Sequence, residues 1–588
     1  MNGSLHLPLL RIPAANGARA SRPPGSVLRL LAAACLWLGF FTLHAPASVS
    51  TTMNEGNHEL GIEFPNGVQT RYAFHPVRLT AVNGGSRPVA WQVRIREQVY
   101  NQDGLSLNPS GHVERIVVEP GRTVERNLLV AIGRYEEQSR WSRLQVVVTT
   151  PQGDTRNWSP SSRSSSSSGR VTSPALLTNE AADALRDAPH VTEDFHGRLD
   201  PNAAARDWRG FSAFSTLVLR PEDWHEMSPS VRTAVGDWAR MGGHLQFIGG
   251  MPGDAPAPDV PGSPRRGLGG VHPPPDGDGN RPRMRDLPAV AAADANHTPS
   301  FAAMRLGLHT IQPWLGERGK DLLTDRFVIW PMVAVLVVFF IMITPVNLFV
   351  LAPSRRRHLL FRTIPAISLA ACVLLALAVA LGDGVGGRGE RFVWIESRPG
   401  AENREFITQW QASRCGALAR TAFTVPDAAY IAPISPPGST VSLRVAGDRL
   451  EAGGGWFTSR ANQTHFLQAA RPGRGRIEWQ PGGGAPHAVA TFDFPLRNVY
   501  ALGEDGTWWH AASMKQGERT ELEPVDAEVA LARIEEITEK YPHSEGIHAM
   551  ARRPGHYIAF TDSPSAIESL RSIRWSDTGV VTGLLATP

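Results

Sequence analysis

The sequence predicts a multidomain, membrane-anchored protein that combines an exported β-sandwich, an α/β module, a transmembrane helical hairpin and a C-terminal β-rich domain. Three observations lead to this prediction. The chain has 588 residues, several times the roughly 150 of one domain. Two uncharged apolar stretches, Phe327–Leu351 and Thr363–Leu381, flank an arginine-rich turn. The chain on both sides of them is dominated by short runs that alternate apolar and polar residues, as half-buried strands do.

Composition narrows the class of protein and its partners. The 59 Lys+Arg against 55 Asp+Glu leave a net charge of only +4, too weak to indicate a nucleic-acid partner. Three cysteines cannot build a disulfide framework. The 56 Gly and 47 Pro indicate many turns and loop-rich β structure.

Residues 1–47 are typical of a signal peptide or an N-terminal anchor. An apolar core, Leu30–Leu43, follows scattered arginines and precedes Ala45-Pro46-Ala47, a small-x-small cleavage pattern. The long segment before this core also fits an uncleaved anchor helix, so both interpretations stay open. A signal peptide would export the residues that follow.

Residues 53–150 have the pattern of an antiparallel β-sandwich. Short alternating runs such as Val77–Val82 are separated by turn signals such as Asn83-Gly84-Gly85. No helical period competes in this window. Residues 151–174 follow as a flexible, serine-rich linker.

Residues 175–325 change to an α/β pattern. The expected elements are a helix at Asn179–Ala188, a strand at Thr216–Leu219, a helix at Ser228–Arg240 and a strand at His244–Ile248. A strand, a helix, a glycine pair and a second strand are typical of a parallel βαβ unit. Residues 252–288, rich in Pro, Gly, Asp and Arg, are expected to be a disordered insertion.

Each apolar stretch, at residues 327–351 and 363–381, is long enough to cross a bilayer core of about 30 Å at about 1.5 Å per residue. The turn between them, residues 352–362, holds four arginines. The positive-inside rule places so short a basic loop in the cytoplasm and both long flanks on the other side. We therefore expect a multi-pass membrane protein in contact with the lipid bilayer, in which Asn347 bonds across the hairpin. A buried core hairpin of a soluble protein is the alternative.

Residues 390–588 return to a β pattern, with an amphipathic helix at Asp526–Tyr541. The expected strands are Arg391–Ile395, Glu405–Trp410, Val441–Val445, Arg476–Trp479, Val489–Phe494, Asn498–Leu502, Tyr557–Phe560 and Val580–Leu585. The preceding stretch, Gly384–Gly389, matches the dinucleotide pattern G-x-G-x-x-G. That pattern works only between a strand and a helix, so we interpret the stretch as a linker.

The residues that could carry chemistry do not form a known catalytic pattern. Carboxylate and imidazole groups gather in the α/β module at His190, Asp194, His196, Asp223, His225 and Glu226. We interpret them as surface or loop residues, because the chain has no H-E-x-x-H pair and no G-x-S-x-G or G-x-C-x-G nucleophile turn. Cys415 is interpreted as a buried or free thiol. We therefore assign no catalytic, cofactor-binding or metal-binding residue.

One ordered set of short motifs resembles a known family. The set includes Trp208-Arg209-Gly210-Phe211, Gly242-Gly243-His244-Leu245, Thr344–Leu351 and Pro554–Ala559. It is similar to a module of uncharacterised bacterial membrane proteins with an extracytoplasmic, degenerate class I glutamine amidotransferase-like domain. The resemblance implies a flavodoxin-like fold for the α/β module and a place in the bacterial inner membrane. It does not imply amidotransferase activity, because the nucleophilic cysteine of active members is absent.

The sequence thus predicts an extracytoplasmic, membrane-anchored scaffold or accessory protein, non-catalytic and without a cofactor. By analogy with accessory subunits of membrane transport systems, other membrane proteins are its expected partners. An exported hydrolase is one alternative, with Asp194, Asp223 and His225 as its acids and base. A ligand- or carbohydrate-binding sensor is another, and it would present Trp208, Trp224 and Trp238 as an exposed aromatic platform.

Overall fold

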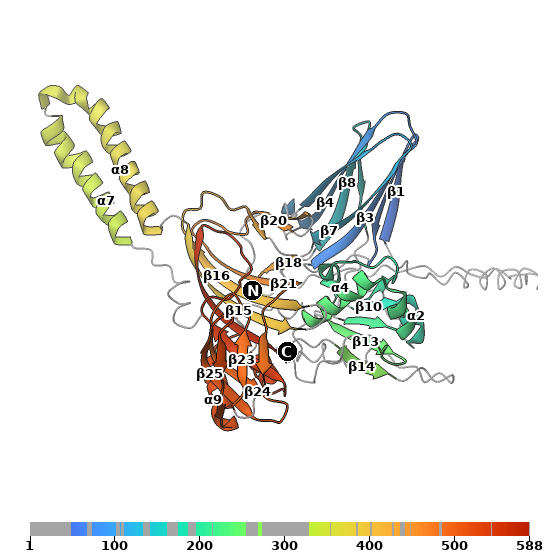
Figure 1. The fold of residues 1–588 in the computed structure, drawn as a ribbon. Helices are drawn as coiled ribbons and strands as arrows, with labels where there is room; N and C mark the ends of the chain where they lie inside the picture. The colour runs from blue at the N-terminus through green and yellow to red at the C-terminus, as the bar shows by residue number, and fades with distance from the viewer. Residues whose placement is uncertain are drawn as a thin grey trace, which may run out of the picture. The chain divides into compact units, whose positions relative to one another are not determined.

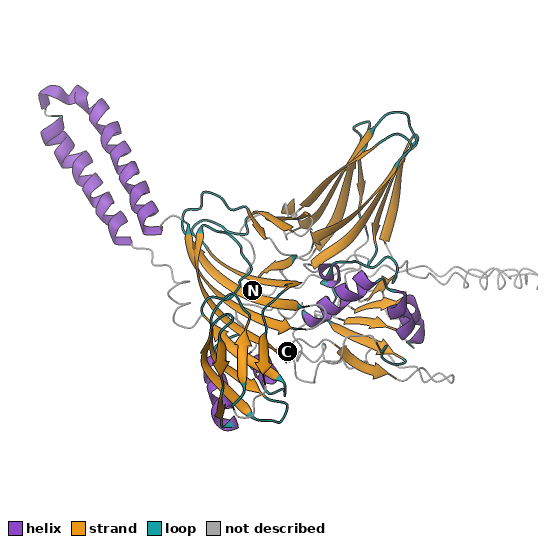
Figure 2. Cartoon of the chain, viewed as in Figure 1, coloured by secondary structure: helices purple, strands orange, loops and turns teal. Residues whose placement is uncertain are grey.

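The computed structural model describes residues 49–66, 73–100, 106–107, 111–132, 141–160, 175–185, 196–214, 216–253, 268–272, 329–352, 354–383, 386–399, 403–425, 428–434, 441–446, 449–480, 485–542 and 544–586. The expected leader lies outside these residues, as do most of the serine-rich linker and most of the insertion. Within them the chain is rich in β-sheet and contains a helical hairpin (Figure 1). The remaining helices are short and belong to the parallel-sheet region and to the C-terminal part of the chain (Figure 2).

Two antiparallel sheets share one apolar core in the N-terminal part of the chain. The first has the order β1-β2-β3-β7 and the second β5-β4-β8-β9, with β6 also paired to β4. Their bounds are Val49–Glu55 (β1), His58–Phe64 (β2), Ala73–Asn83 (β3), Val89–Tyr100 (β4), Ser106–Leu107 (β5), Gly111–Val118 (β6), Thr123–Ile132 (β7), Trp141–Thr149 (β8) and Thr155–Trp158 (β9). Buried Val77 and Leu79 alternate with half-buried Arg78 along β3, and Trp91 of the other sheet joins the same core. The expected pair of β-sandwich-like sheets is therefore present.

The limits of this pair differ from the expected 53–150. Strand β1 begins at Val49, and β9 pairs with β8 as far as Trp158. The ring of Trp158 packs against Phe64, with centroids 6.0 Å apart. This long-range contact explains why a polar segment expected to be linker forms a strand.

A five-stranded parallel sheet follows, with the order β11-β10-β12-β13-β14. Its strands are Ala175–Thr178 (β10), His196–Leu199 (β11), Thr216–Leu219 (β12), His244–Ile248 (β13) and Leu268–His272 (β14). Its helices are Asn179–Ala184 (α2), the 3₁₀ turn Trp208–Phe211 (η1), Pro221–Glu226 (α3) and Pro229–Arg240 (α4). Every residue of β12 and β13 is buried, as expected for parallel strands covered on both faces.

Two expectations for this region need correction. Strand β14 lies within 252–288, so the prediction of a wholly disordered insertion is wrong at Leu268–His272. The open edge of β13 supplies the hydrogen bonds for this strand. The glycine-rich local sequence alone does not predict this pairing. Helix α2 ends at Ala184 rather than Ala188, because Leu185 is buried in an extended conformation.

The two apolar stretches form the helical hairpin. Its segments are α7 (Ile329–Ile341), the π-helix η5 (Met342–Leu351), the 3₁₀ segment η6 (Ser354–Leu359) and α8 (Leu360–Asp383). By length and composition, Val333–Leu351 and Arg356–Leu377 could each cross a membrane, with mean hydropathies of 2.7 and 2.1. The described structure therefore holds two candidate membrane spans.

The first of these spans contains a proline and a buried amide. Pro345 has no N–H for the carbonyl four residues earlier, and the helix there has π geometry. Asn347 is fully buried, yet neither polar atom of its side chain has a hydrogen-bond partner among the described residues. The expected bond from Asn347 across the hairpin is therefore not formed.

The C-terminal part of the chain contains a twelve-stranded sheet whose main path is β18-β21-β16-β15-β29-β28-β24-β25-β27, and a three-stranded sheet β17-β20-β19. The bounds are Gly387–Arg398 (β15), Arg404–Cys415 (β16), Phe423–Val425 (β17), Ala429–Pro433 (β18), Val441–Ala446 (β19), Arg449–Gly454 (β20), Asn462–Pro472 (β21), Ile477–Gln480 (β22), His487–Ala490 (β23), Leu496–Leu502 (β24), Trp508–Met514 (β25), Arg519–Glu521 (β26), Glu523–Val525 (β27), His556–Thr561 (β28) and Ile573–Ala586 (β29). Helices α9 (Ala527–Thr538) and α10 (Ser544–Ala551) complete it. The expected helix at Asp526–Tyr541 corresponds to α9, with Asp526 as its N-cap.

The glycine-rich stretch before this domain is partly a strand. Gly387 and Gly389 are residues of β15, opposite Cys415 and Ser413 of β16, so the linker prediction is wrong from Gly387 onward. The stretch leads into a strand and not into a helix, which leaves no dinucleotide-binding turn there.

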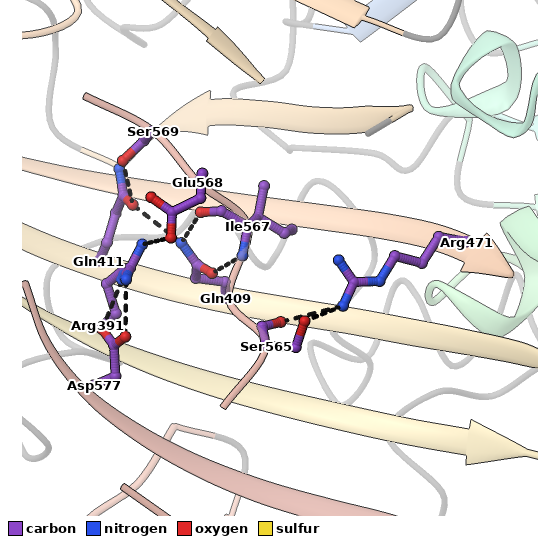
Figure 3. A network of polar contacts seen from close by, with 9 residues as sticks. All are labelled: Arg391, Gln409, Gln411, Arg471, Ser565, Ile567, Glu568, Ser569 and Asp577. Atoms are coloured by element: carbon purple, nitrogen blue, oxygen red, sulfur yellow. Dashed lines mark hydrogen bonds and ion pairs between the residues drawn. The ribbon is translucent and has the colours of Figure 1, made fainter. Parts of the chain in front are cut away.

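The connection from β28 to β29 crosses the face of this sheet, and we call its residues 565–572 the strap (Figure 3). The side chain of Gln409 pairs with the backbone of Ile567, accepting from its N–H at 2.8 Å and donating to its carbonyl at 3.0 Å. Ser569 donates to Gln411 at 3.3 Å, and Arg471 donates to the hydroxyl of Ser565 at 2.6 Å. Backbone and side-chain bonds together therefore hold the strap on β16 and β21.

Candidate functional site

The parallel sheet has a topological switch point between β10 and β12. In chain order its strands are arranged 2-1-3-4-5, so the chain leaves β10 toward one edge and continues from β12 toward the other. In open α/β sheets, ligands bind outside the carboxyl ends of the strands at such a point. Thr178 ends β10 and Arg220 follows β12, so these two positions define the candidate site.

A buried threonine–aspartate pair occupies this position. The Thr178 hydroxyl donates to Oδ2 of Asp223 and accepts from the N–H of Ala181 at 3.2 Å. The same Asp223 oxygen accepts from the N–H of Arg220 at 2.7 Å. The pair thus caps α2 and α3 at once, because it satisfies N–H groups that each helix start leaves open.

The electrostatics of Asp223 follow from its burial. Only 1% of the residue is exposed, and burial raises the pKa of its carboxyl above the ordinary value of 3.8. The hydrogen bonds from Thr178 and Arg220 oppose this rise, while the nearby Glu180 adds to it. The place where related topologies receive an anion is therefore filled by a carboxyl group of the chain itself.

The remaining chemistry-bearing residues do not converge on this site. His225 and Glu226 are exposed on α3. His225 is two positions from Asp223, and about 100° per helical residue turns the two side chains to opposite sides. His190 and Asp194 lie outside the described residues, as does the side chain of His196. The described residues contain no group of three or more His, Cys, Asp or Glu side chains that could hold a metal ion.

The aromatic platform of the sensor alternative is absent. Trp208 is 3% exposed, Trp224 2% and Trp238 fully buried. Trp224 meets Phe247 edge to face at 5.9 Å, and Trp238 lies 6.2 Å from Phe211. These rings belong to the core of the module, as tryptophans at helical spacing more often do, so the sensor alternative loses its platform.

Cys415 is a buried free thiol, as expected. Its sulfur donates to Oε1 of Gln463 at 3.2 Å, and burial raises the pKa of the thiol to about 11. The nucleophilic thiolate is therefore scarce at neutral pH.

A second functional feature is a junction where the three globular parts meet. Arg209 of η1 is fully buried and pairs with Asp207, with 2.6 Å between Nη2 and Oδ2. Its Nη1 donates to the carbonyl of Ala429 in β18 at 3.1 Å. The guanidinium also lies 5.6 Å from the ring centre of Phe74 in β3. One side chain therefore contacts the sandwich, the parallel-sheet module and the C-terminal domain.

Aromatic packing and backbone bonds support this junction. Tyr430 of β18 lies 5.7 Å from Phe74 and 6.5 Å from Trp208, measured between ring centroids. The N–H of Phe74 donates to the hydroxyl of Ser212 at 3.0 Å. A Cβ added at Gly210 would lie 2.6 Å from Cβ of Ala205. The motif Trp208-Arg209-Gly210-Phe211 is thus the core of a domain junction.

Helix α4 forms a second seam with the C-terminal sheet. Asp237 is paired with Arg404 of β16, and Gln468 of β21 donates to the carbonyl of Met241 at 3.0 Å. The guanidinium of Arg240 lies 5.9 Å from the ring centre of Phe406. Sequence reasoning missed this seam and the role of Arg209. An arginine between Trp208 and Gly210 in an otherwise apolar motif was the only local signal.

No family model and no curated protein matches the chain. Among solved structures, the alkylpurine DNA glycosylase AlkC of Pseudomonas fluorescens bound to abasic-site DNA is similar over 18% of this chain and 31% of that chain, at 10% identity and a TM-score of 0.14. A Bacteroides uniformis beta-glucuronidase is similar over 35% and 24%, at 10% identity and a TM-score of 0.13. The Mu homology domain of Danio rerio Fcho1, with a bound Eps15 peptide, is similar over 34% and 96%, at 9% identity and a TM-score of 0.17. None of these three likenesses supports a fold or a function for the chain.

Proposed function

We propose that this protein is a membrane-anchored, non-catalytic scaffold or accessory protein that holds its three globular parts on the extracytoplasmic side of a bacterial inner membrane. The exposure of the apolar hairpin carries the proposal. Phe340 is 66% exposed, Phe349 80% and Phe361 86%. Exposed apolar area costs about 25 cal/mol per Å² in water, whereas a bilayer accommodates it. A core hairpin of a soluble protein would bury these side chains.

The charge of the hairpin turn supports the orientation. Arg355 lies between the two candidate spans, and Arg356, Arg357 and Arg362 lie in the first turns of the second span, Arg356–Leu377. The positive-inside rule keeps such a short basic turn in the cytoplasm. Both globular flanks of the hairpin then lie on the opposite side.

The buried contacts between the globular parts support a scaffold rather than loosely tethered modules. Arg209 contacts Ala429 and Phe74 at the same time, and Asp237 with Arg404 makes a second link. Domains joined in this way would present partner-binding surfaces in a fixed arrangement. Other membrane proteins, such as a transport system, are the proposed partners.

We also propose that the parallel-sheet module is a degenerate class I glutamine amidotransferase-like domain. Its strand order supports this assignment. The turn from β12 into α3 carries Arg220 and Pro221, and neither can act as a nucleophile. The capping of both helices by Thr178 and Asp223 further favours a structural role for this edge of the sheet.

A variant with charged hairpin residues tests the anchor. V337R/L374R places one arginine in each span, and each costs about 3 kcal/mol near a helix centre in a bilayer. We expect this variant to leave the membrane fraction during alkaline carbonate extraction while wild type stays. V113R/V117R is the matched control, because Val113 and Val117 are exposed on β6. Equal extraction of wild type and V337R/L374R would reject the anchor.

Affinity purification tests the scaffold role. Full-length protein tagged at the C-terminus is isolated from membranes, and co-purifying proteins are identified by mass spectrometry. Reproducible recovery of a membrane complex, weakened by R209A but not by R220A, supports the proposal. Recovery of the protein alone, with its hairpin in the membrane, would remove the scaffold role and leave the anchor.

A further inference from the structure

A cavity of about 660 Å³ lies beside the residue at which the chain leaves the hairpin, Gly386. Phe423 and Leu570 give it apolar walls, and both side chains are largely buried. Arg420 and Arg571 also line it, and both are exposed. The cavity thus combines apolar walls with two accessible guanidinium groups.

The backbone fixes this cavity close to the end of α8. Gly386 follows Asp383, the last residue of α8, by three positions, which span at most about 10 Å. Its N–H donates to the carbonyl of Ala417 at 3.0 Å, and its carbonyl accepts from Gly416 at 2.7 Å. Its φ of +86° suits glycine, and an added Cβ would lie 2.2 Å from the carbonyl oxygen of Ser572. Gly386 is therefore held in the wall of the cavity, close to Ser572 of the strap.

The strap forms one wall of the cavity through residues 569–572. Ser569 lines the cavity and donates to Gln411 on β16 at 3.3 Å (Figure 3). Two residues earlier, Ile567 is bound to Gln409 through its backbone. Leu570 and Arg571 follow directly along the strap. Their place in the cavity is therefore set by the sheet.

A row of arginines stands on the neighbouring strands. Arg414, Arg388 and Arg574 occupy paired positions on β16, β15 and β29. Their side chains therefore share one face of the sheet, opposite the face on which Gln411 contacts the strap. Like charges at paired positions repel each other. Among the described residues, no ion pair is formed by Arg388, Arg420, Arg571 or Arg574. This end of the sheet therefore carries positive charge that can attract an anion.

We infer that this cavity binds the headgroup phosphate of an anionic phospholipid from the leaflet in which α8 ends. Arg420 and Arg571 contact the phosphate, because guanidinium groups match phosphate oxygens in geometry and charge. Phe423 and Leu570 pack against the glycerol and the first acyl carbons. Arg388 and Arg574, on the other face of the sheet, add only long-range attraction toward an anionic lipid surface. The inference rests on the proposed membrane anchor, which brings the cavity to the headgroup layer.

Native mass spectrometry of the full-length protein in detergent tests this site. The protein is titrated with phosphatidylglycerol and, separately, with phosphatidylcholine. We expect phosphatidylglycerol to bind more tightly, and R420Q/R571Q to weaken it about 25-fold, at about fivefold per arginine. The matched control R519Q/R552Q removes two exposed arginines, one in β26 and one directly after α10, and it should keep wild-type affinity. Equal loss in both double variants would reduce the effect to net charge and overturn the site.

Further measurements separate this inference from the anchor and from free phosphate. Hydrogen exchange of 419–424 and 569–574 should slow when phosphatidylglycerol is added, and inorganic phosphate at the same concentration should not reproduce this. Protection by inorganic phosphate alone would overturn the lipid assignment. If the protein resists carbonate extraction but shows no preference for anionic lipid, the lipid site is overturned and the anchor stands. A protein that is extracted loses the anchor and the site together. A cooperative thermal transition close to that of wild type is required of R420Q/R571Q, so that weaker binding is not caused by misfolding.

Discussion

Arg209 donates a hydrogen bond of 3.1 Å to the carbonyl oxygen of Ala429, across 220 positions of sequence that include the whole helical hairpin. The arginine is fully buried and the acceptor is backbone. A buried cation needs both charge and hydrogen-bond partners, and Asp207 supplies the charge. The flank before the hairpin and the flank after it are therefore bound together by a group that neither can satisfy alone.

Substitution of Arg209 should loosen this junction. R209A leaves the buried Ala429 carbonyl without its donor, while Asp207, whose side chain is 35% exposed, can be hydrated. We expect a loss of about 1–3 kcal/mol in the free energy of unfolding. The free energy of unfolding of R209K should fall almost as far. An ammonium group cannot make the forked contact with Asp207 and reach the Ala429 carbonyl at the same time. Urea unfolding of the full chain in detergent, followed by tryptophan fluorescence, measures both.

R220A is the control for the junction. Arg220 pairs with Glu222, but their side chains are 42% and 62% exposed, and such pairs contribute about 0–1 kcal/mol. R209K unfolding at the same urea concentration as wild type would show that the junction needs only a positive charge.

The Thr178–Asp223 pair predicts an unusual pH dependence. The pKa of Asp223 is raised by burial, so the folded protein keeps this proton in a pH range where the unfolded chain has released it. The contribution of Asp223 to stability is then full below pH 3.8, and it is lost as the pH rises through the native pKa. D223N stays neutral at every pH. Its free energy of unfolding should equal that of wild type in acid and exceed it increasingly toward neutral pH.

D223A separates the charge of Asp223 from its hydrogen bonds. It removes the acceptor for Thr178 and for the N–H of Arg220. We expect it to cost about 1–3 kcal/mol in acid, and the difference from wild type should narrow toward neutral pH as wild type loses the contribution of Asp223. Urea unfolding at several pH values compares the three proteins. A difference between D223N and wild type that does not change with pH would show that Asp223 is not the titrating group.

The elements best predicted from the sequence are those whose signals are local. The short, mostly apolar runs Thr216–Leu219 and His244–Ile248 are bounded by turn residues, and they correspond to β12 and β13 residue for residue. Strand β29 was expected only at Val580–Leu585, although it begins at Ile573. Its polar first half is a strand because it pairs with β15, a partner that local periodicity cannot reveal.

In the candidate site and the junction, too, the role of a residue depends on partners that are distant in sequence. Asp223 could be listed among possible functional residues, but its role depends on Thr178, 45 positions earlier. The role of Arg209 depends on a backbone carbonyl, which has no side-chain identity to read from the sequence. Such partners emerge only when the fold brings them together.

Cys415 should be inert in the folded protein. The thiol is buried, donates to Gln463 and has a pKa of about 11, so little thiolate forms at neutral pH. In a C35S/C372S background, we expect maleimide to label Cys415 only after denaturation. Rapid labelling under native conditions, in protein shown by its thermal transition to be folded, would mean that this end of β16 opens.

His465 should make the C-terminal domain sensitive to acid. Its Nε2 donates to the carbonyl of Trp456 at 2.9 Å, and Gln411 donates to its Nδ1 at 3.4 Å. A proton on Nδ1 would face the amide N–H of Gln411, whose oxygen already accepts from Gln409 and Ser569. Burial lowers the pKa of His465 from 6.5 to about 4, so the ring is neutral at pH 7.

The sign of the effect follows from proton binding. The unfolded chain takes up this proton below pH 6.5, whereas the folded protein does so only near pH 4. The contribution of His465 is therefore full above pH 6.5 and is lost as the pH falls, by about 3 kcal/mol in total. H465Q keeps a donor and an acceptor but cannot titrate. Its unfolding free energy, measured in urea from pH 7 to pH 4, should decline less steeply than that of wild type. Because every other histidine is common to both proteins, parallel curves would exclude His465 as the acid-sensitive group.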